Sequence, residues 1–121
     1  MNFLCVALGG AAGAMARYAI SLIPAKADFP IWTLLTNIAG AVLIGLVVGI
    51  AAGGRDVSPH AVLFWKTGVC GGFTTFSTFS LEALALLEKK AYGMGGLYIL
   101  LSVVCCIAGV WCGRKLAMLL R

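Results

Sequence analysis

Hydrophobic residues dominate four long stretches of the chain, and short polar segments separate them. The hydrophobic stretches cover residues 3–23, 31–52, 61–87 and 94–113. A helix that crosses the hydrocarbon core of a bilayer needs about 20 consecutive apolar residues. The pattern therefore predicts an all-α membrane protein in which residues 1–121 form a single domain of four transmembrane helices.

The connecting segments "PAKADFP", "GGRDVSP" and "EKKAYG" contain turn formers and charged residues. In the second segment, the Ser58 side chain can cap the free N–H groups of a following helix, and Pro59 suits the first helical position. We therefore expect the third helix to begin close to this point.

The composition agrees with a chain surrounded by membrane lipid. Hydrophobic residues make up 62% of the sequence and charged residues 11%, whereas a soluble domain has about half and about a quarter. The opening residues have no basic region of the kind that precedes the apolar core of a signal peptide. We therefore expect an integral membrane protein whose N-terminus belongs to the mature fold.

The net charge of +5 is scattered, without a basic run or an exposed aromatic platform, so we expect no nucleic-acid partner. The basic residues outside the membrane divide almost evenly between the two sides: Arg55, Arg114, Lys115 and Arg121 on one, and Lys26, Lys89 and Lys90 on the other. Such a balance gives a weak positive-inside bias. A chain without a preferred orientation could insert both ways and pair as an antiparallel homodimer.

Three pairs of glycines have the spacing that lets helix backbones approach closely in lipid. They are Gly9 and Gly13, Gly45 and Gly49, and Gly109 and Gly113. Four helices of one copy would have difficulty enclosing a polar pathway alone. We therefore expect these glycines to provide packing surfaces, including surfaces for a partner copy.

Polar side chains inside a membrane span are costly and usually face protein or a water-filled cavity. Asn37 could bond to a neighbouring helix or line a path. Arg17 could extend its charge to the interface or attract anions into a vestibule, and Lys66 has the same two readings, with the interface favoured. Glu82 could couple transport to protons, accept a hydrogen bond from a hydroxyl, or pair with a basic residue.

The stretch "GGFTTFSTF", residues 71–79, interrupts the third hydrophobic segment. Each of its two glycines destabilises a helix by about 1 kcal/mol relative to alanine, and the hydroxyls of Thr74, Thr75, Ser77 and Thr78 can satisfy a freed backbone. We predict a broken third helix. Its exposed carbonyls and N–H groups would form an ion site, and two antiparallel copies could direct carbonyls at one cation.

Phe76 and Phe79 are three residues apart and share one face of the helix that resumes after the break, with Ser80 near them. Aromatic residues at this spacing usually pack a core. The positive edge of a phenyl ring can also stabilise a small anion, so both roles stay open.

The segment "GGFTTFSTFSLE" resembles the signature of the Fluc (CrcB) family of bacterial fluoride channels, and "GGAAGAMARY" and "TLLTNIAGAVLIG" extend the resemblance into the first two spans. The resemblance implies a four-helix subunit in an antiparallel, dual-topology homodimer of the bacterial plasma (inner) membrane. It also implies two fluoride pores and a central structural sodium ion.

The resemblance assigns roles to individual positions. The backbone carbonyls of Gly71 and Thr74 would hold the sodium ion, Arg17 would help to attract fluoride, and Glu82 is the nearby acid. The implied pore residues are Asn37, Phe76, Ser77, Thr78, Phe79, Ser80, Tyr98 and Ser102. A further serine of the family falls on Val104 here, which puts the fourth-helix part of the path in doubt.

The implied function is passive export of fluoride, which lowers its cytoplasmic concentration and requires no catalytic group, so the chain would not be an enzyme. One alternative is a proton-coupled small multidrug exporter. Such exporters resemble one another in an acidic residue on the first span, which is absent here, so Glu82 would have to replace it. The other alternative is an accessory membrane subunit, which gives no reason for two glycines beside a hydroxyl-rich stretch.

Overall fold

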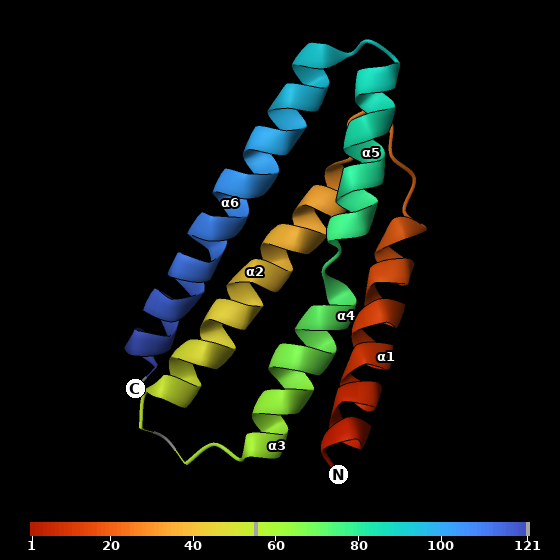
Figure 1. Ribbon diagram of the computed structural model, residues 1–121. Helices are drawn as coiled ribbons and strands as arrows, with labels where there is room; N and C mark the ends of the chain where they lie inside the picture. Colours follow the sequence, from red (N-terminus) through yellow and green to blue (C-terminus); the bar gives the residue numbers. More distant parts are fainter. Residues whose placement is uncertain (55, 121) are drawn as a thin grey trace.

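The computed structural model describes residues 1–54 and 56–120 and contains four helical segments long and apolar enough to cross a membrane (Figure 1). Helix α1 covers Asn2–Ser21, α2 covers Ile31–Ala52, the third segment covers Pro59–Glu88, and α6 covers Tyr92–Leu119. The prediction of four membrane helices is confirmed. Helix α6 is longer than expected because it continues through Arg114 and Lys115, whose long side chains a helix near the membrane surface tolerates.

The third segment consists of several pieces. It begins with α3 (Pro59–Val62), continues as a π-helix, η1 (Leu63–Cys70), and then as α4 (Gly71–Phe73). Thr74 and Thr75 have extended backbone angles, and α5 (Phe76–Glu88) follows. The predicted break is therefore present. Pro59 is the first helical residue as expected, but the Ser58 side chain makes no capping hydrogen bond, so that part of the prediction was wrong.

The break lies after the two glycines and not at them. Gly71 and Gly72 are both helical, and the extended residues begin at Thr74. A side chain at Gly72 would collide with the Gly10 carbonyl oxygen of α1. Gly72 therefore allows α4 to lie against α1, and this tertiary packing outweighs the low helix propensity of glycine.

The spans form two closely packed pairs, α1 with η1 and α4, and α2 with α6 (Figure 1). Glycines make both contacts possible: a Cβ atom at Gly9 would meet the Phe64 carbonyl oxygen, and one at Gly113 would meet that of Val42. The prediction that the spaced glycines pack helices is confirmed. The expectation that they would serve a partner copy needs correction, because α1, α2 and α6 use them within one chain.

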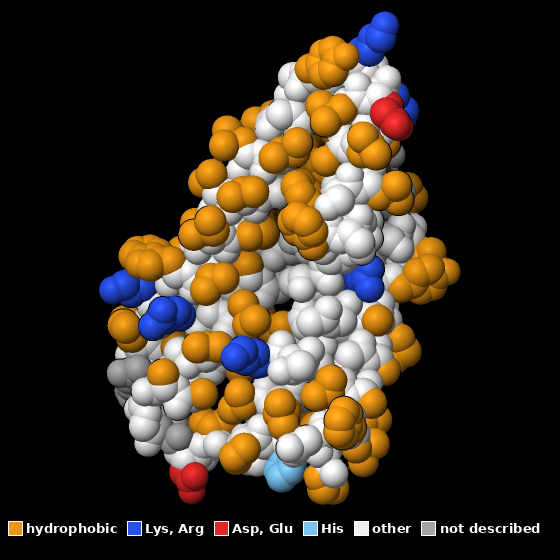
Figure 2. Space-filling model, in the orientation of Figure 1, with side chains coloured by type: hydrophobic (Ala, Val, Ile, Leu, Met, Phe, Trp, Pro, Cys, Tyr) orange, Lys and Arg blue, Asp and Glu red, His pale blue; other side chains and the backbone are white. Residues whose placement is uncertain are grey.

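The buried core lies between α2, α5 and α6. Its residues are Leu34, Phe79, Ala83, Leu86 and Tyr98. Much of the remaining surface is apolar, as expected for a chain in contact with lipid, and a hollow is visible in the middle of the molecule (Figure 2).

The charged residues counted for orientation lie at opposite ends of the molecule. Lys26 lies in the α1–α2 connection, and Lys89 and Lys90 lie in the connection between α5 and α6. Arg114 and Lys115 lie in the last turns of α6, at the end where both chain termini are found (Figure 1). Arg55 and Arg121, which belong to the same count, lie outside the described residues.

Candidate functional site

The hydroxyl side chains at the break bind the backbone that the interruption frees. The N–H group and Oγ1 of Thr74 both donate to the Cys70 carbonyl oxygen, at 3.0 and 2.8 Å. Oγ1 of Thr75 caps α5 by accepting a hydrogen bond from the Thr78 N–H group at 3.1 Å. The prediction that local hydroxyls satisfy the break is therefore confirmed for these two threonines.

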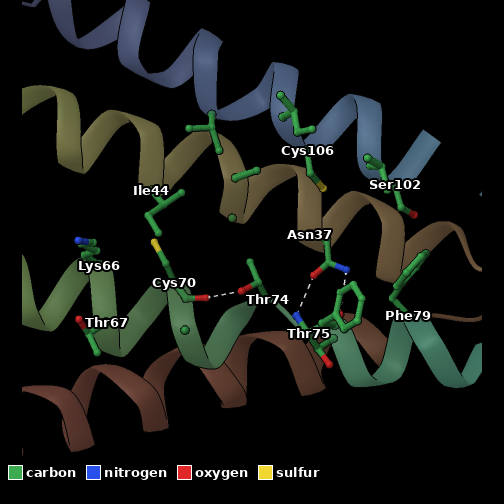
Figure 3. Close-up of a pocket in the computed structure, with 17 residues that line it drawn as sticks. Asn37, Ile44, Lys66, Thr67, Cys70, Thr74, Thr75, Phe79, Ser102 and Cys106 are labelled. Atoms are coloured by element: carbon green, nitrogen blue, oxygen red, sulfur yellow. Dashed lines mark hydrogen bonds between the residues drawn. The ribbon is translucent and has the colours of Figure 1, made fainter. Parts of the chain in front are cut away.

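The Asn37 side chain holds the break from the neighbouring helix α2 (Figure 3). Its Oδ1 accepts a hydrogen bond from the Thr75 N–H group at 2.8 Å, and its Nδ2 donates to the Thr75 carbonyl oxygen at 3.1 Å. Asn37 also lines the larger of the cavities beside the break. The two roles considered for Asn37 thus coincide geometrically: it bonds to a neighbouring segment, and it borders an open space.

Arg17 binds the other side of the break. Its Nε donates to the Gly72 carbonyl oxygen at 3.1 Å, so the side chain is fixed against α4. This contact differs from the simple picture of a side chain that extends to the membrane surface. Arg17 lines a smaller cavity of about 380 Å³, where Thr75, Thr78 and Glu82 lie as well.

The larger cavity, about 700 Å³, lies between α2, η1, the break and α6. Its walls are mostly apolar, and a few polar groups face it. Figure 3 shows Lys66 at one end, Ser102 and Phe79 at the opposite end, and the Asn37–Thr75 hydrogen bonds between them. The cavity therefore follows the broken helix and passes the break itself.

Phe76 and Phe79 both line the larger cavity, with ring centroids 5.4 Å apart, as their spacing predicts. Their environments differ strongly, because Phe79 is 9% exposed and Phe76 is 79% exposed. The Phe79 ring also lies 5.2 Å from that of Tyr98. Phe79 is therefore a fixed wall of the cavity, whereas Phe76 projects away from the subunit.

Glu82 joins three helices through two hydroxyl groups. Thr33 Oγ1 of α2 donates to Glu82 Oε1 at 2.8 Å, and the Tyr98 hydroxyl of α6 donates to Oε2 at 2.7 Å. Of the three readings considered for Glu82, the structure shows the hydrogen bonds to hydroxyls. Sequence reasoning missed Thr33, although a hydroxyl four residues before Asn37 shares its helix face and was a usable signal.

Tyr98 and Ser102 lie on one face of α6, as predicted, but they have different surroundings. Tyr98 is fully buried and stands behind Phe79, outside the larger cavity. Ser102 is 7% exposed and lines that cavity, and its Oγ has no hydrogen-bond partner among the described residues. Buried hydroxyls in folded proteins almost always have a hydrogen-bond partner, so this unpaired oxygen marks Ser102 as a residue that requires an explanation. Val104, where the family serine is missing, is 54% exposed and does not line the cavity.

Three predicted pore hydroxyls do not reach the larger cavity. Ser80 Oγ donates to the Phe76 carbonyl oxygen at 2.8 Å, and Ser77 Oγ lies 3.3 Å from Thr75 Oγ1. Thr78 lines the smaller cavity and accepts a hydrogen bond from Thr75 Oγ1 at 3.0 Å. Within this subunit these residues stabilise the break and the start of α5, and the structure does not bring them together with Ser102.

Gly71 and Thr74 fit a cation site built from backbone oxygen. Both line the larger cavity, and the space beside Gly71 is open, since a Cβ atom there would meet no heavy atom within 4 Å. No side chain of the described residues donates a hydrogen bond to the carbonyl oxygen of Gly71 or Thr74. The described part of the chain also contains no cluster of three or more His, Cys, Asp or Glu residues that could hold a metal ion. One subunit would offer two backbone carbonyls to such an ion.

The sequence model of the family described as "CrcB-like protein, Camphor Resistance (CrcB)" matches residues 4–114. The chain is similar to proteins named fluoride-specific ion channel FluC: it is 46% identical to that of Agrobacterium fabrum (strain C58), over 96% of this chain and 95% of the relative. It is 42% identical to that of Rhodopseudomonas palustris (strain BisB5), over 96% of each chain, and 44% identical to that of Thermococcus kodakarensis, over 94% of each. With its four helices that can span a membrane, the chain is a multi-pass membrane protein. The chain belongs to the CrcB-like protein family.

Proposed function

We propose that the chain forms a fluoride-selective channel of the plasma (inner) membrane, through which fluoride leaves the cell passively down its electrochemical gradient. The observation that carries this proposal is the cavity beside the helix break, which ends at Phe79 and at the unpaired hydroxyl of Ser102. The relatives named as fluoride-specific ion channels supply the identity of the ion.

The cavity offers what a small, strongly hydrated anion needs when it loses water. Ser102 Oγ can donate a hydrogen bond, and the positive edge of the Phe79 ring can face the ion. Among the described residues that line the larger cavity there is no Asp or Glu, so none of them places a carboxylate that would repel the anion there. Weak, distributed contacts of this kind favour conduction because the ion can also leave.

The surroundings of Glu82 favour passive flow of fluoride over transport coupled to protons. Both carboxylate oxygens of Glu82 accept hydrogen bonds, and the residue lines the smaller cavity and not the larger one. The family is one of ion channels, so the chain is not an enzyme, and nothing in the comparisons favours a multidrug exporter or an accessory subunit.

The functional unit would be an antiparallel homodimer with a structural sodium ion between the two breaks. The groove along α2, η1 and α6 is open on one side, and Gly71 and Thr74 lie on its wall. A second copy in the opposite orientation would bring its own two carbonyls to the same place. When bound, sodium would supply the positive charge that holds four carbonyl dipoles together, and the chain would contribute only backbone oxygen.

The direct test is fluoride efflux from liposomes that contain the purified protein, measured with a fluoride electrode while a potassium ionophore balances the charge. We expect rapid fluoride efflux and strong exclusion of chloride. No efflux, or efflux that requires a proton gradient, would overturn the channel proposal.

The dimer and the sodium ion need separate tests. Cross-linking in the membrane should give a dimer, and an introduced cysteine at the α5–α6 connection should be labelled from both sides. Replacement of sodium by a large organic cation should lower the thermal stability of the dimer. Labelling from one side only, or a stability independent of sodium, would contradict these parts of the proposal.

A further inference from the structure

Lys66 is a charged residue inside the third span that the proposed pathway does not yet use. It lies on η1, its side chain is exposed, and it lines the larger cavity (Figure 3). No ion pair involves Lys66 within the part of the chain that the structure describes. An ionisable residue at membrane depth that faces a cavity is usually functional, because its charge is costly in lipid.

The position of Lys66 places it well within the helix bundle. Gly68, two residues further on, contacts Gly9 near the middle of α1. Gly9 follows Asn2, the first residue of that helix, by seven positions, which corresponds to roughly 10 Å along the helix axis. The Lys66 backbone is therefore well inside the span, and its side chain lines an open groove.

Lys66 dominates the electrostatics of that groove. It is the one charged residue among the described residues that line the larger cavity, whose other walls are apolar groups, hydroxyls and Asn37. A cleft with charge of one sign and low-dielectric walls focuses the field and raises the local concentration of ions of the opposite sign. The groove should therefore raise the local concentration of small anions.

The other positive charge near the break lies on the opposite side of it. Arg17 lines the smaller cavity, and Thr75 lines both cavities. The break is thus flanked by Lys66 in one cavity and Arg17 in the other. Within the larger cavity, Lys66 and the Ser102–Phe79 end lie at opposite ends (Figure 3).

We propose that Lys66 is an anion-attracting residue: its ammonium group raises the local concentration of small inorganic anions in the larger cavity and so speeds the arrival of fluoride at Ser102 and Phe79. This inference rests on the proposed function. Lys66 should not contribute to the selectivity for fluoride, because a single ammonium group attracts chloride as well as fluoride.

The test is the Lys66→Gln variant in liposomes, with fluoride flux compared at low and high ionic strength. Screening extends over about 30 Å at 0.01 M salt and about 3 Å at 1 M. We expect the fluoride flux of Lys66→Gln to be about threefold to tenfold below that of the wild type at the low ionic strength, and close to the wild-type value at the high ionic strength. Lys66→Arg should keep wild-type flux at both. Lys89→Gln, at the exposed connection between α5 and α6, is the matched control and should behave like the wild type.

The outcomes separate this inference from the proposed function. A wild-type chain that carries no fluoride overturns the proposed function and the inference with it. A conducting wild type with equal flux in Lys66→Gln at low ionic strength overturns the inference alone. A Lys66→Gln variant that loses its dimer, measured by cross-linking, would show that Lys66 pairs with the partner copy and not with free anions, which also overturns the inference.

Discussion

Asn37 is the side chain whose removal should damage the helix break most directly. In Asn37→Ala, the Thr75 N–H group and carbonyl oxygen both lose their partner. Leaving a buried polar group unpaired costs about 1–3 kcal/mol, so two such groups give roughly 2–6 kcal/mol. Because Asn37 borders a cavity that admits water, we expect the lower part of that range, a loss of about 2–4 kcal/mol in the free energy of unfolding.

Reversible unfolding of the protein in detergent micelles measures this loss, with fluoride flux recorded in parallel. Asn37→Asp is an informative companion: its carboxylate can still accept from the Thr75 N–H group, but it brings a negative charge into the span and against the Thr75 carbonyl oxygen, so this variant should be at least as destabilised as Asn37→Ala. Thr67→Ala is the matched control: Thr67 lines the same cavity without a hydrogen bond in the described structure, and its removal should change stability by less than about 0.5 kcal/mol. An Asn37→Ala protein as stable as the control would refute the reasoning.

Three further predictions concern other residues of the site and the fold. Phe79→Ile should reduce fluoride flux at least about tenfold and leave the dimer intact in cross-linking, whereas normal flux would show that the ring edge is unnecessary. Gly113→Ala should destabilise the protein by about 1–3 kcal/mol, because the added methyl group would meet the Val42 carbonyl oxygen. Gly96→Ala is the control, since a Cβ atom at Gly96 would meet no heavy atom within 4 Å. Equal melting temperatures of the two variants would contradict the packing account. Glu82→Gln, whose amide cannot exchange a proton, should conduct fluoride without a proton gradient as the wild type does. A wild-type flux that depends on a proton gradient, together with a loss of that dependence in the variant, would support coupling through Glu82.

The course of the membrane spans could be predicted because hydrophobic length alone determines it. Helix α2 begins and ends at the predicted residues, and the break appeared in the sequence as glycines beside hydroxyls. Its exact place could not be predicted, since it depends on how Gly72 fits against Gly10 of another helix. The π-helical geometry of η1 was likewise absent from the pattern, because an apolar run looks the same in both helix types.

The residues that form the site could be predicted better than the contacts between them. The sequence indicated that Asn37 and Glu82 needed polar surroundings, because unpaired polar groups are costly in a membrane, whereas Tyr98 was named only through the family resemblance. Which partner each one meets depends on the faces that the helices present to one another, and so the Thr33–Glu82–Tyr98 connection was not foreseen. The same reason explains why Ser102 lines the larger cavity while Ser77, Thr78 and Ser80 do not.

The reversal potential of a bilayer containing the purified protein tests the central claim most directly. With a tenfold fluoride gradient, equal chloride and equal pH on both sides, a passive fluoride-selective channel should reverse near the fluoride equilibrium potential, about 59 mV in magnitude. Imposing a pH gradient should leave that value unchanged. A reversal potential near zero under the fluoride gradient, or one that follows the pH gradient, would contradict the account.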